Sequence, residues 1–217
     1  MTDVHNLGLF ILAGWLLNLT PGPDVLYIVS SALRSGAKAG VVAALGITAG
    51  CFVHIFAAAL GVSALMAASS TAFTALKWAG AAYLFYVGLK LVLSSGTKPV
   101  ELMVANPVQT SDKNLKGIFF KGFLTNTLNP KVALFFLAFV PQFIAPQASH
   151  PALTFVLLGV LFNVNALPIN VGYALLAAWA TRRLSAVQRA LHWLDRVAGV
   201  MFVGFGIRLA LTEAPGG

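Results

Sequence analysis

The sequence predicts an all-α integral membrane protein with six transmembrane helices. We expect two three-helix halves that form an inverted-topology repeat, with the first and fourth helices broken. Of the 217 residues, 59% are hydrophobic and 9% are charged, whereas a soluble domain carries about 25% charged residues. The hydrophobic residues form runs of about 20 or more, the length that spans a bilayer. Two of these runs are interrupted by proline at matching positions.

The first run extends from about Leu7 to Leu33 and is interrupted by Asn18-Leu-Thr-Pro-Gly-Pro-Asp24. Each proline removes a backbone N–H donor and clashes with the preceding turn, so the helix is expected to break here. Broken backbone is tolerated at membrane depth only where it is buried in protein or lines a polar cavity. An ionisable residue such as Asp24 at this depth indicates a functional site.

Two further runs complete the first half, residues 1–95. The second run, from about Ala39 to Ala67, contains Gly46-Ile-Thr-Ala-Gly50, a small-xxx-small spacing that permits close helix packing. The third run extends from about Thr71 to Leu93. The polar segment 96–115 then reads as a linker between two halves of a single transporter domain, residues 1–217.

The second half, residues 116–217, repeats this order. The fourth run, from about Gly117 to Ile144, is interrupted at Asn129-Pro130-Lys131, and the fifth extends from about Ala152 to Ala180. The sixth run, from about Leu191 to Leu211, is the weakest. It contains the charged residues Asp195, Arg196 and Arg208. Five spans therefore remain an alternative to six.

The basic residues predict the orientation. With six spans, eleven Lys and Arg lie in or beside the first, third and fifth loops, whereas two lie on the other side. Basic loops stay in the cytoplasm, so both termini are expected outside. Because each half has three spans, the halves would insert in opposite orientations. The segment with Asp24 would then enter from outside and the segment with Lys131 from inside, with both breaks near the bilayer midplane.

Three segments share a pattern with a known family: Asn18-Leu-Thr-Pro-Gly-Pro-Asp24, Arg34-Ser-Gly-Ala-Lys-Ala-Gly40, and Lys121-Gly-Phe-Leu-Thr-Asn-Thr-Leu-Asn-Pro-Lys131 with the following Phe135–Phe143. Over its whole length the chain resembles the LysE/RhtB family of amino-acid exporters, or LysE family translocators. The resemblance implies a multi-pass protein of the bacterial cytoplasmic (inner) membrane. It also implies export of amino acids or close derivatives from the cytoplasm, by antiport with protons. It does not select one amino acid.

The two breaks carry groups suited to a zwitterionic amino acid. Unpaired N–H groups at the helix start near Pro21–Pro23 would attract a carboxylate. We expect Thr20 and Asn129 to cap the helices that follow them. Asp24 would bind the substrate ammonium and carry the coupled proton, and Lys131 would bind the carboxylate. Burial favours the protonated form of Asp24, and a nearby lysine favours its ionised form. A substrate that enters between Asp24 and Lys131 would therefore change the protonation equilibrium of Asp24.

An Asp24–Lys131 ion pair that only joins the halves is the structural alternative. Asn18 and Asn126, one turn before the breaks, are expected to bind freed carbonyls. The asparagines of the fifth run either line a cavity or bridge helices. His54 is expected to be a packed histidine with a backbone partner rather than a proton relay or metal ligand. The predicted substrate-binding or proton-coupling residues are Asp24, Lys131, Asn18, Thr20, Pro21, Gly22, Pro23, Asn126, Asn129, Pro130, Asn163 and Asn165.

Other function classes are less favoured. The single cysteine, Cys51, excludes an intrachain disulfide and paired-cysteine chemistry. The absence of His-Glu-x-x-His and Gly-x-Ser-x-Gly motifs argues against an intramembrane enzyme. An exporter of a metal ion or another small metabolite stays the alternative, although four scattered histidines do not favour a metal. We expect no cofactor, no bound metal and no nucleic acid. The Gly- and Ala-rich faces suit a homodimer and internal packing equally well.

Overall fold

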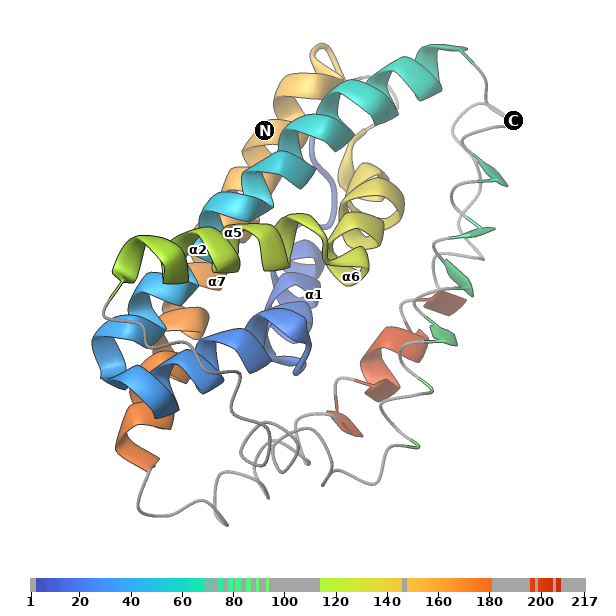
Figure 1. Cartoon of the computed structure of the whole chain (residues 1–217). Coiled ribbons are helices and arrows are strands. Elements are labelled where there is room, and N and C mark those ends of the chain that lie inside the picture. The colour runs from blue at the N-terminus through green and yellow to red at the C-terminus, as the bar shows by residue number, and fades with distance from the viewer. Residues whose placement is uncertain are drawn as a thin grey trace.

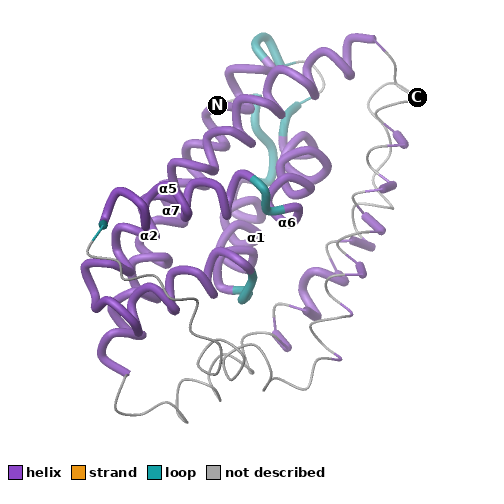
Figure 2. Tube along the Cα trace, viewed as in Figure 1, coloured by secondary structure: helices purple, strands orange, loops and turns teal. Residues whose placement is uncertain are grey.

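The computed structural model describes residues 3–68, 114–145 and 148–180, with short stretches between 71 and 93 and between 196 and 207. Within these residues every regular element is a helix (Figures 1 and 2), which agrees with the predicted all-α class. Pro23–Gly61 and Pro151–Trp179 are long and apolar enough to cross a membrane, and a bent helix pair is a third candidate. The predicted third and sixth runs and the linker lie largely outside the described residues.

The first break separates two helices. Helix α1 covers Leu7–Leu19, and helix α2 covers Pro23–Ala68. The backbone of α2 leaves helical geometry at Gly36, where φ is 83° and ψ is 176°. Glycine adopts a positive φ without the steric cost that a side chain imposes. The predicted turn between the first two runs is therefore a kink at Gly36.

The second break bends the chain by 46° between Leu115–Thr127 and Pro130–Phe143. Helix α5 covers Leu115–Thr127 and helix α6 covers Pro130–Leu134, followed by a π-helical turn, η1, at Phe135–Phe139 and a 3₁₀ turn, η2, at Val140–Phe143. The predicted cap is confirmed, because the Asn129 side chain accepts a hydrogen bond from the Lys131 N–H at 3.0 Å.

Helix α7 covers Pro151–Trp179 and stays continuous through Pro168. Helix α2 packs along both α5 and α7, as Figure 1 shows. The small-xxx-small motif faces α5. A side chain at Gly46 would collide with the Phe119 carbonyl oxygen, and one at Gly50 would collide with that of Phe123. The close packing expected from these glycines is confirmed.

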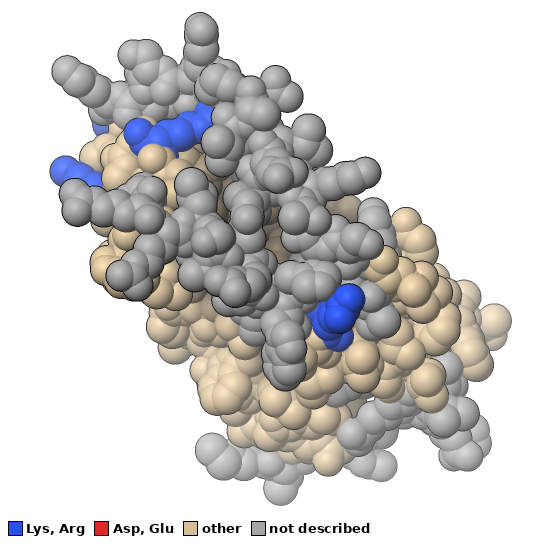
Figure 3. Space-filling model, turned by 90° about the horizontal axis from the view of Figure 1, so that it is seen from below, with Lys and Arg blue, Asp and Glu red and all other residues tan. Residues whose placement is uncertain are grey.

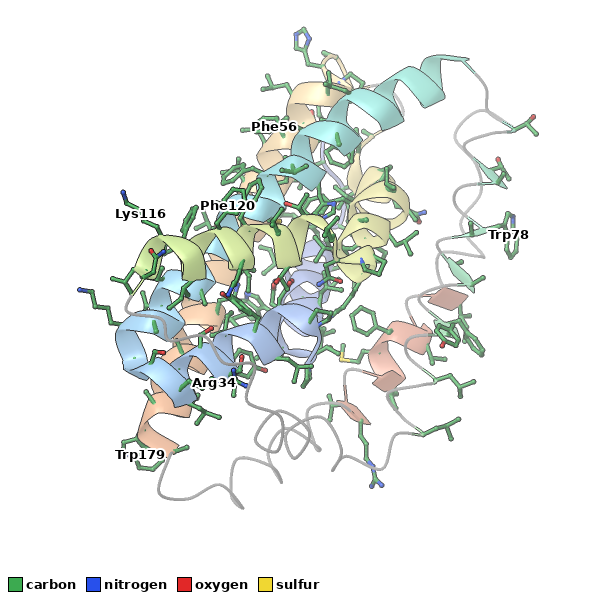
Figure 4. The ribbon with its side chains drawn as sticks, viewed as in Figure 1. Arg34, Phe56, Trp78, Lys116, Phe120 and Trp179 are labelled. Atoms are coloured by element: carbon green, nitrogen blue, oxygen red, sulfur yellow. The ribbon has the colours of Figure 1, made fainter. Side chains whose placement is uncertain are left out.

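Aromatic rings hold α1, η1, η2 and α7 together. Phe135 is central to this cluster, because its ring centroid lies 5.0 Å from that of Phe162 and 6.4 Å from that of Phe10. Large apolar side chains also point outward, where lipid would cover them. Phe56, Phe120 and Trp179 are labelled examples in Figure 4, and each is more than half exposed.

The described helices have two opposite ends. The kinked first part of α2, the start of α5 and the end of α7 lie toward one end, whereas the N-terminus, the end of α2 and the start of α7 lie toward the other (Figure 1). Figure 3 shows Lys and Arg side chains gathered mainly toward the first end, and Figure 4 places Arg34 and Lys116 there. At the second end, the N-terminal segment pairs with the chain after η2. His5 N donates to Phe143 O at 3.0 Å, and Ala145 N donates to Asp3 O at 2.9 Å.

Candidate functional site

The two helix breaks meet at a small cavity of about 20 Å³. That volume is room for about one water molecule. Asp24 and Val25 at the first break and Lys131 and Val132 at the second all line it. The structure therefore brings together the two segments that match in the sequence. The complete lining is Leu17, Asn18, Thr20, Gly22, Asp24, Val25, Ile47, Thr48, Cys51, Asn126, Asn129, Lys131, Val132, Phe162, Asn163, Ala166 and Asn170.

Most of the predicted site residues lie at this cavity. Eight of them line it: Asn18, Thr20, Gly22, Asp24, Asn126, Asn129, Lys131 and Asn163. Pro21, Pro23 and Pro130 shape the backbone around it and are not among the lining residues. Asn165 lies elsewhere on α7. Its side chain accepts a hydrogen bond from Trp15 Nε1 at 3.4 Å and donates to Leu161 O at 2.9 Å.

The Asp24 carboxylate is held on one side only. Asn126 Nδ2 donates to Asp24 Oδ2 at 2.8 Å. The second oxygen, Asp24 Oδ1, and the amide oxygen of Asn126 are both buried, and neither has a hydrogen-bond partner among the residues that the structure describes. Buried acceptors without a donor cost free energy. Both residues line the cavity, so its unsatisfied groups favour a ligand that donates hydrogen bonds.

The Lys131 ammonium binds the end of α1. Its Nζ donates to Leu17 O at 2.7 Å and to Thr20 O at 2.9 Å. Leu17 O lies four residues before Pro21, which has no N–H to donate to it. A cation here also complements the negative end of the α1 dipole. Lys131 therefore repairs the helix break, and its positive charge acts on Asp24 as well.

The other freed carbonyls are also bound from neighbouring helices. Pro23 leaves Leu19 O without its helical donor, and the Tyr173 hydroxyl donates to it at 2.7 Å. Pro130 has no N–H for Asn126 O, which accepts instead from the Asn129 N–H at 2.8 Å, and His54 Nε2 lies 2.8 Å from the same oxygen. Each proline of the first break is thus compensated by a side chain from another part of the chain.

These contacts correct one prediction and confirm another. The expectation that Asn18 and Asn126 bind the freed carbonyls is wrong. Asn18 Nδ2 donates to Gly14 O at 2.7 Å within α1, and the Asn126 amide binds Asp24. His54 is confirmed as a packed histidine with a backbone partner.

The expected cap at Thr20 is also wrong. Thr20 ends α1, because both its N–H and its hydroxyl donate to Leu16 O. Helix α2 begins three residues later, at Pro23. Either proline suits the first position of a helix, and Gly22 between them forms part of the connection. The Lys131 side chain passes close to Gly22, with Nζ 3.6 Å from the position of a Cβ built there.

Several lining residues are not among the site residues predicted from the sequence. Thr48 lies between Gly46 and Gly50 in the sequence but projects from another side of α2, and its carbonyl accepts from Asn163 Nδ2 of α7 at 3.0 Å. Asn170 lies two turns after Asn163 on the same face of α7, which the seven-residue spacing indicates. In the described part of the chain, no three His, Cys, Asp or Glu side chains converge as metal ligands.

The sequence also has known relatives. The family described as LysE type translocator matches residues 15–213. An uncharacterized membrane protein of Pseudomonas aeruginosa is 34% identical over 93% of both chains. One from Vibrio cholerae is 30% identical over 98% of this chain and 100% of the relative. A leucine efflux protein of Salmonella choleraesuis is 26% identical over 97% of both chains.

No solved structure matches the chain. The family model covers most of the sequence, and two relatives at 30% identity or more align over nearly their full lengths. The protein is therefore a membrane protein of the LysE type translocator family, whose members are transporters.

Proposed function

We propose that this protein is a secondary active exporter of amino acids or close derivatives, which it binds between the two helix breaks. One observation carries the proposal. A carboxylate with an unpaired oxygen, Asp24, lies in a cavity formed by two broken helices, beside the unpaired Asn126 oxygen and opposite the charge of Lys131. Broken helices that meet in this way are typical of transporter substrate sites.

The acceptors in the cavity suit a substrate ammonium. An ammonium carries three N–H donors and no acceptor. Asp24 Oδ1 and Asn126 Oδ1 would take two of these donors, and the carboxylate charge would balance the positive charge. The hydrogen bond from Asn126 Nδ2 holds Asp24 in place before the substrate arrives, which lowers the entropic cost of binding.

The substrate carboxylate would lie toward the start of α2. The first turn of a helix presents N–H groups without intrahelical partners and the positive end of the dipole. Gly22 and Val25 at this helix start both line the cavity. Lys131 would contribute its charge from the α1 end while it stays bound to the carbonyls of Leu17 and Thr20.

Asp24 also provides a mechanism for proton antiport. Its carboxylate holds either a proton or the substrate ammonium, because both neutralise the same charge. An isolated charge in the bilayer is costly, so the occupied forms would cross between the two sides more readily than the empty charged form. A proton entering and an amino acid leaving would then alternate on one side chain.

The placement of the helix ends supports the inverted topology. The basic end of the molecule, with the kinked first part of α2 and the start of α5, would face the cytoplasm. The paired segments Asp3–His5 and Phe143–Ala145 would then lie together on the outer side. In that orientation α1 descends from outside and α5 rises from inside, as two opposed halves in a bacterial inner membrane require.

The cavity volume supports a closed conformation. About 20 Å³ does not admit an amino acid, and pockets for drug-sized ligands measure about 300–1,000 Å³. Substrate entry therefore needs movement at the breaks, where the helices are already interrupted and side chains replace the backbone hydrogen bonds.

The relatives support an amino-acid substrate. The family is one of translocators, and a relative that aligns over nearly the whole chain is named a leucine efflux protein.

Counterflow into liposomes tests the proposal. Purified protein is reconstituted and given a panel of labelled amino acids under an imposed pH gradient. We expect saturable uptake of at least one amino acid that collapses with the gradient and with Asp24→Asn. Asp3→Asn makes the same chemical change outside the cavity and should retain the flux. Absence of flux for every amino acid, with folded protein demonstrated, would instead point to a metal ion or another metabolite.

A further inference from the structure

We propose that the cavity selects amino acids with an uncharged, apolar side chain and rejects basic ones. This inference rests on the proposed function and specifies its substrate class. It is carried by the charges and the apolar surface of the cavity.

The charges at the cavity match those of a zwitterion. Among the described residues that line it, Asp24 is the only acid and Lys131 the only base. The whole sequence holds few other acids, and all of these lie near the chain termini, in the polar linker or at the start of the sixth run: Asp3, Glu101, Asp112, Asp195 and Glu213. A neutral amino acid carries one charge of each sign, so its ammonium is balanced by Asp24 and its carboxylate by Lys131.

A basic amino acid brings a third charge. Its α-ammonium would occupy Asp24, and the side-chain cation would remain in the cavity with the Lys131 ammonium nearby. A buried charge without a partner costs several kcal/mol. An acidic amino acid meets the mirror-image problem, because the single lysine already donates to two carbonyls of α1. The cavity therefore disfavours a charged side chain of either sign.

Most of the remaining lining is apolar. Besides the polar groups at the breaks, and Thr48, Asn163 and Asn170 on α2 and α7, the cavity is bounded by Leu17, Val25, Ile47, Val132, Phe162 and Ala166. All six are buried. Apolar walls with a few convergent polar groups favour a ligand that is polar at one end and apolar at the other. The apolar walls would accept the substrate side chain, and the breaks would hold its charged groups.

Phe162 forms a fixed wall of this apolar part. Its ring centroid lies 5.0 Å from that of Phe135 and 5.3 Å from that of Phe136. Its opposite edge faces α1, where a Cβ on Gly14 would lie 3.1 Å from Phe162 Cδ2. The ring is held between these neighbours, so Phe162 limits the length of the side chain that the cavity admits.

Counterflow with the wild-type protein tests the substrate class without any mutation. The panel contains leucine, valine and methionine, together with lysine, arginine and glutamate. We expect initial rates for the neutral apolar substrates at least about tenfold above those of the charged ones, a discrimination that one unfavourable contact supplies. Equal or faster flux of lysine or arginine, lost in Asp24→Asn, would overturn the inference and leave the proposed function standing. No flux of any amino acid would instead overturn the proposed function and this inference with it.

A second acid in the cavity should weaken the selection against basic amino acids. Asn170 lines the cavity and is 4% exposed, so Asn170→Asp adds a carboxyl group of nearly the same shape. We expect the ratio of lysine to leucine flux to rise about tenfold. Asn114→Asp is the matched control, since Asn114 is exposed, caps α5, and aspartate caps equally well. An unchanged ratio in folded Asn170→Asp, or an equal rise in the control, would contradict the assignment.

Discussion

The Lys131 ammonium lies 2.7 Å from the carbonyl oxygen of Leu17, the same oxygen that Pro21 deprives of its helical donor. The second break thus supplies the group that repairs the first. A lysine at membrane depth is costly on its own, and two carbonyl acceptors together with the nearby charge of Asp24 offset that cost. This contact joins the two breaks.

Removing the ammonium should therefore destabilise the protein. Lys131→Met leaves Leu17 O and Thr20 O without the donor that now binds them. We expect the free energy of unfolding to fall by about 1–3 kcal/mol for each unpaired group, measured by thermal unfolding in detergent. Lys116→Met, at an exposed position on α5, should stay within about 0.5 kcal/mol of the wild type. Equal stability of the two variants would show that the carbonyls do not depend on Lys131.

Two tyrosines provide a sharper comparison. Tyr173 donates to Leu19 O at 2.7 Å, which Pro23 leaves without a helical donor, whereas Tyr27 donates to Ile118 O at 2.9 Å. Ile118 O lies inside α5, where it accepts from the helix as well. Tyr173→Phe should cost about 1–3 kcal/mol, and Tyr27→Phe about 0.5–1.5 kcal/mol. A larger loss in Tyr27→Phe would contradict this account of the break.

Two glycines of α2 should respond differently to substitution by alanine. Gly50→Ala places a methyl group against the Phe123 carbonyl oxygen, so α2 and α5 must separate. Gly61→Ala meets nothing within 4 Å and should gain up to about 1 kcal/mol from helix propensity. We expect a lower midpoint of thermal unfolding in the first variant and an equal or higher one in the second. A neutral Gly50→Ala would mean that the helices are not in close contact there.

Substrate size should respond to one phenylalanine of α7 and not to its neighbour. Phe162→Leu removes part of the apolar wall and should raise the flux of phenylalanine relative to leucine by roughly 10-fold or more. Phe155 is equally buried and packs on Phe136 at 6.2 Å, but it is not among the lining residues. Phe155→Leu should lower stability and leave the flux ratio unchanged. The same shift in both variants would contradict the role of Phe162 as a wall.

Several features of this fold follow from local chemistry and could be predicted from the sequence. Proline removes a backbone donor that a helix needs, asparagine before proline caps the helix that follows, and glycines four residues apart permit close packing. The breaks, the Asn129 cap and the close helix packing at Gly46 and Gly50 therefore follow from the sequence. The sequence also places the Asp24 carboxylate at the first break, because Asp24 directly follows Pro23.

Other features depend on which helix lies opposite each break. Pro21 and Pro23 both suit a helix start, so the sequence does not choose between them, and Thr20 becomes the end of α1. The donors at the freed carbonyls come from residues far away along the chain. Tyr173 lies 154 residues from Leu19, and Lys131 lies 114 residues from Leu17. Hydrophobic patterns do not encode such partners. The sequence therefore predicts Lys131 as a carboxylate ligand or as an ion-pair partner of Asp24, and not as the donor to the carbonyls of α1.

Competition between a proton and an amino acid for Asp24 is the central claim. The direct measurement is the affinity of purified protein in detergent for its best neutral amino acid, measured by calorimetry across a range of pH. We predict that binding weakens as the pH falls, because the proton and the ammonium exclude each other. Over the pH range in which the affinity changes, binding should release the Asp24 proton to the buffer. In Asp24→Asn both the pH dependence and the proton release should disappear. An affinity that is independent of pH in the wild type, with no proton release, would contradict the account.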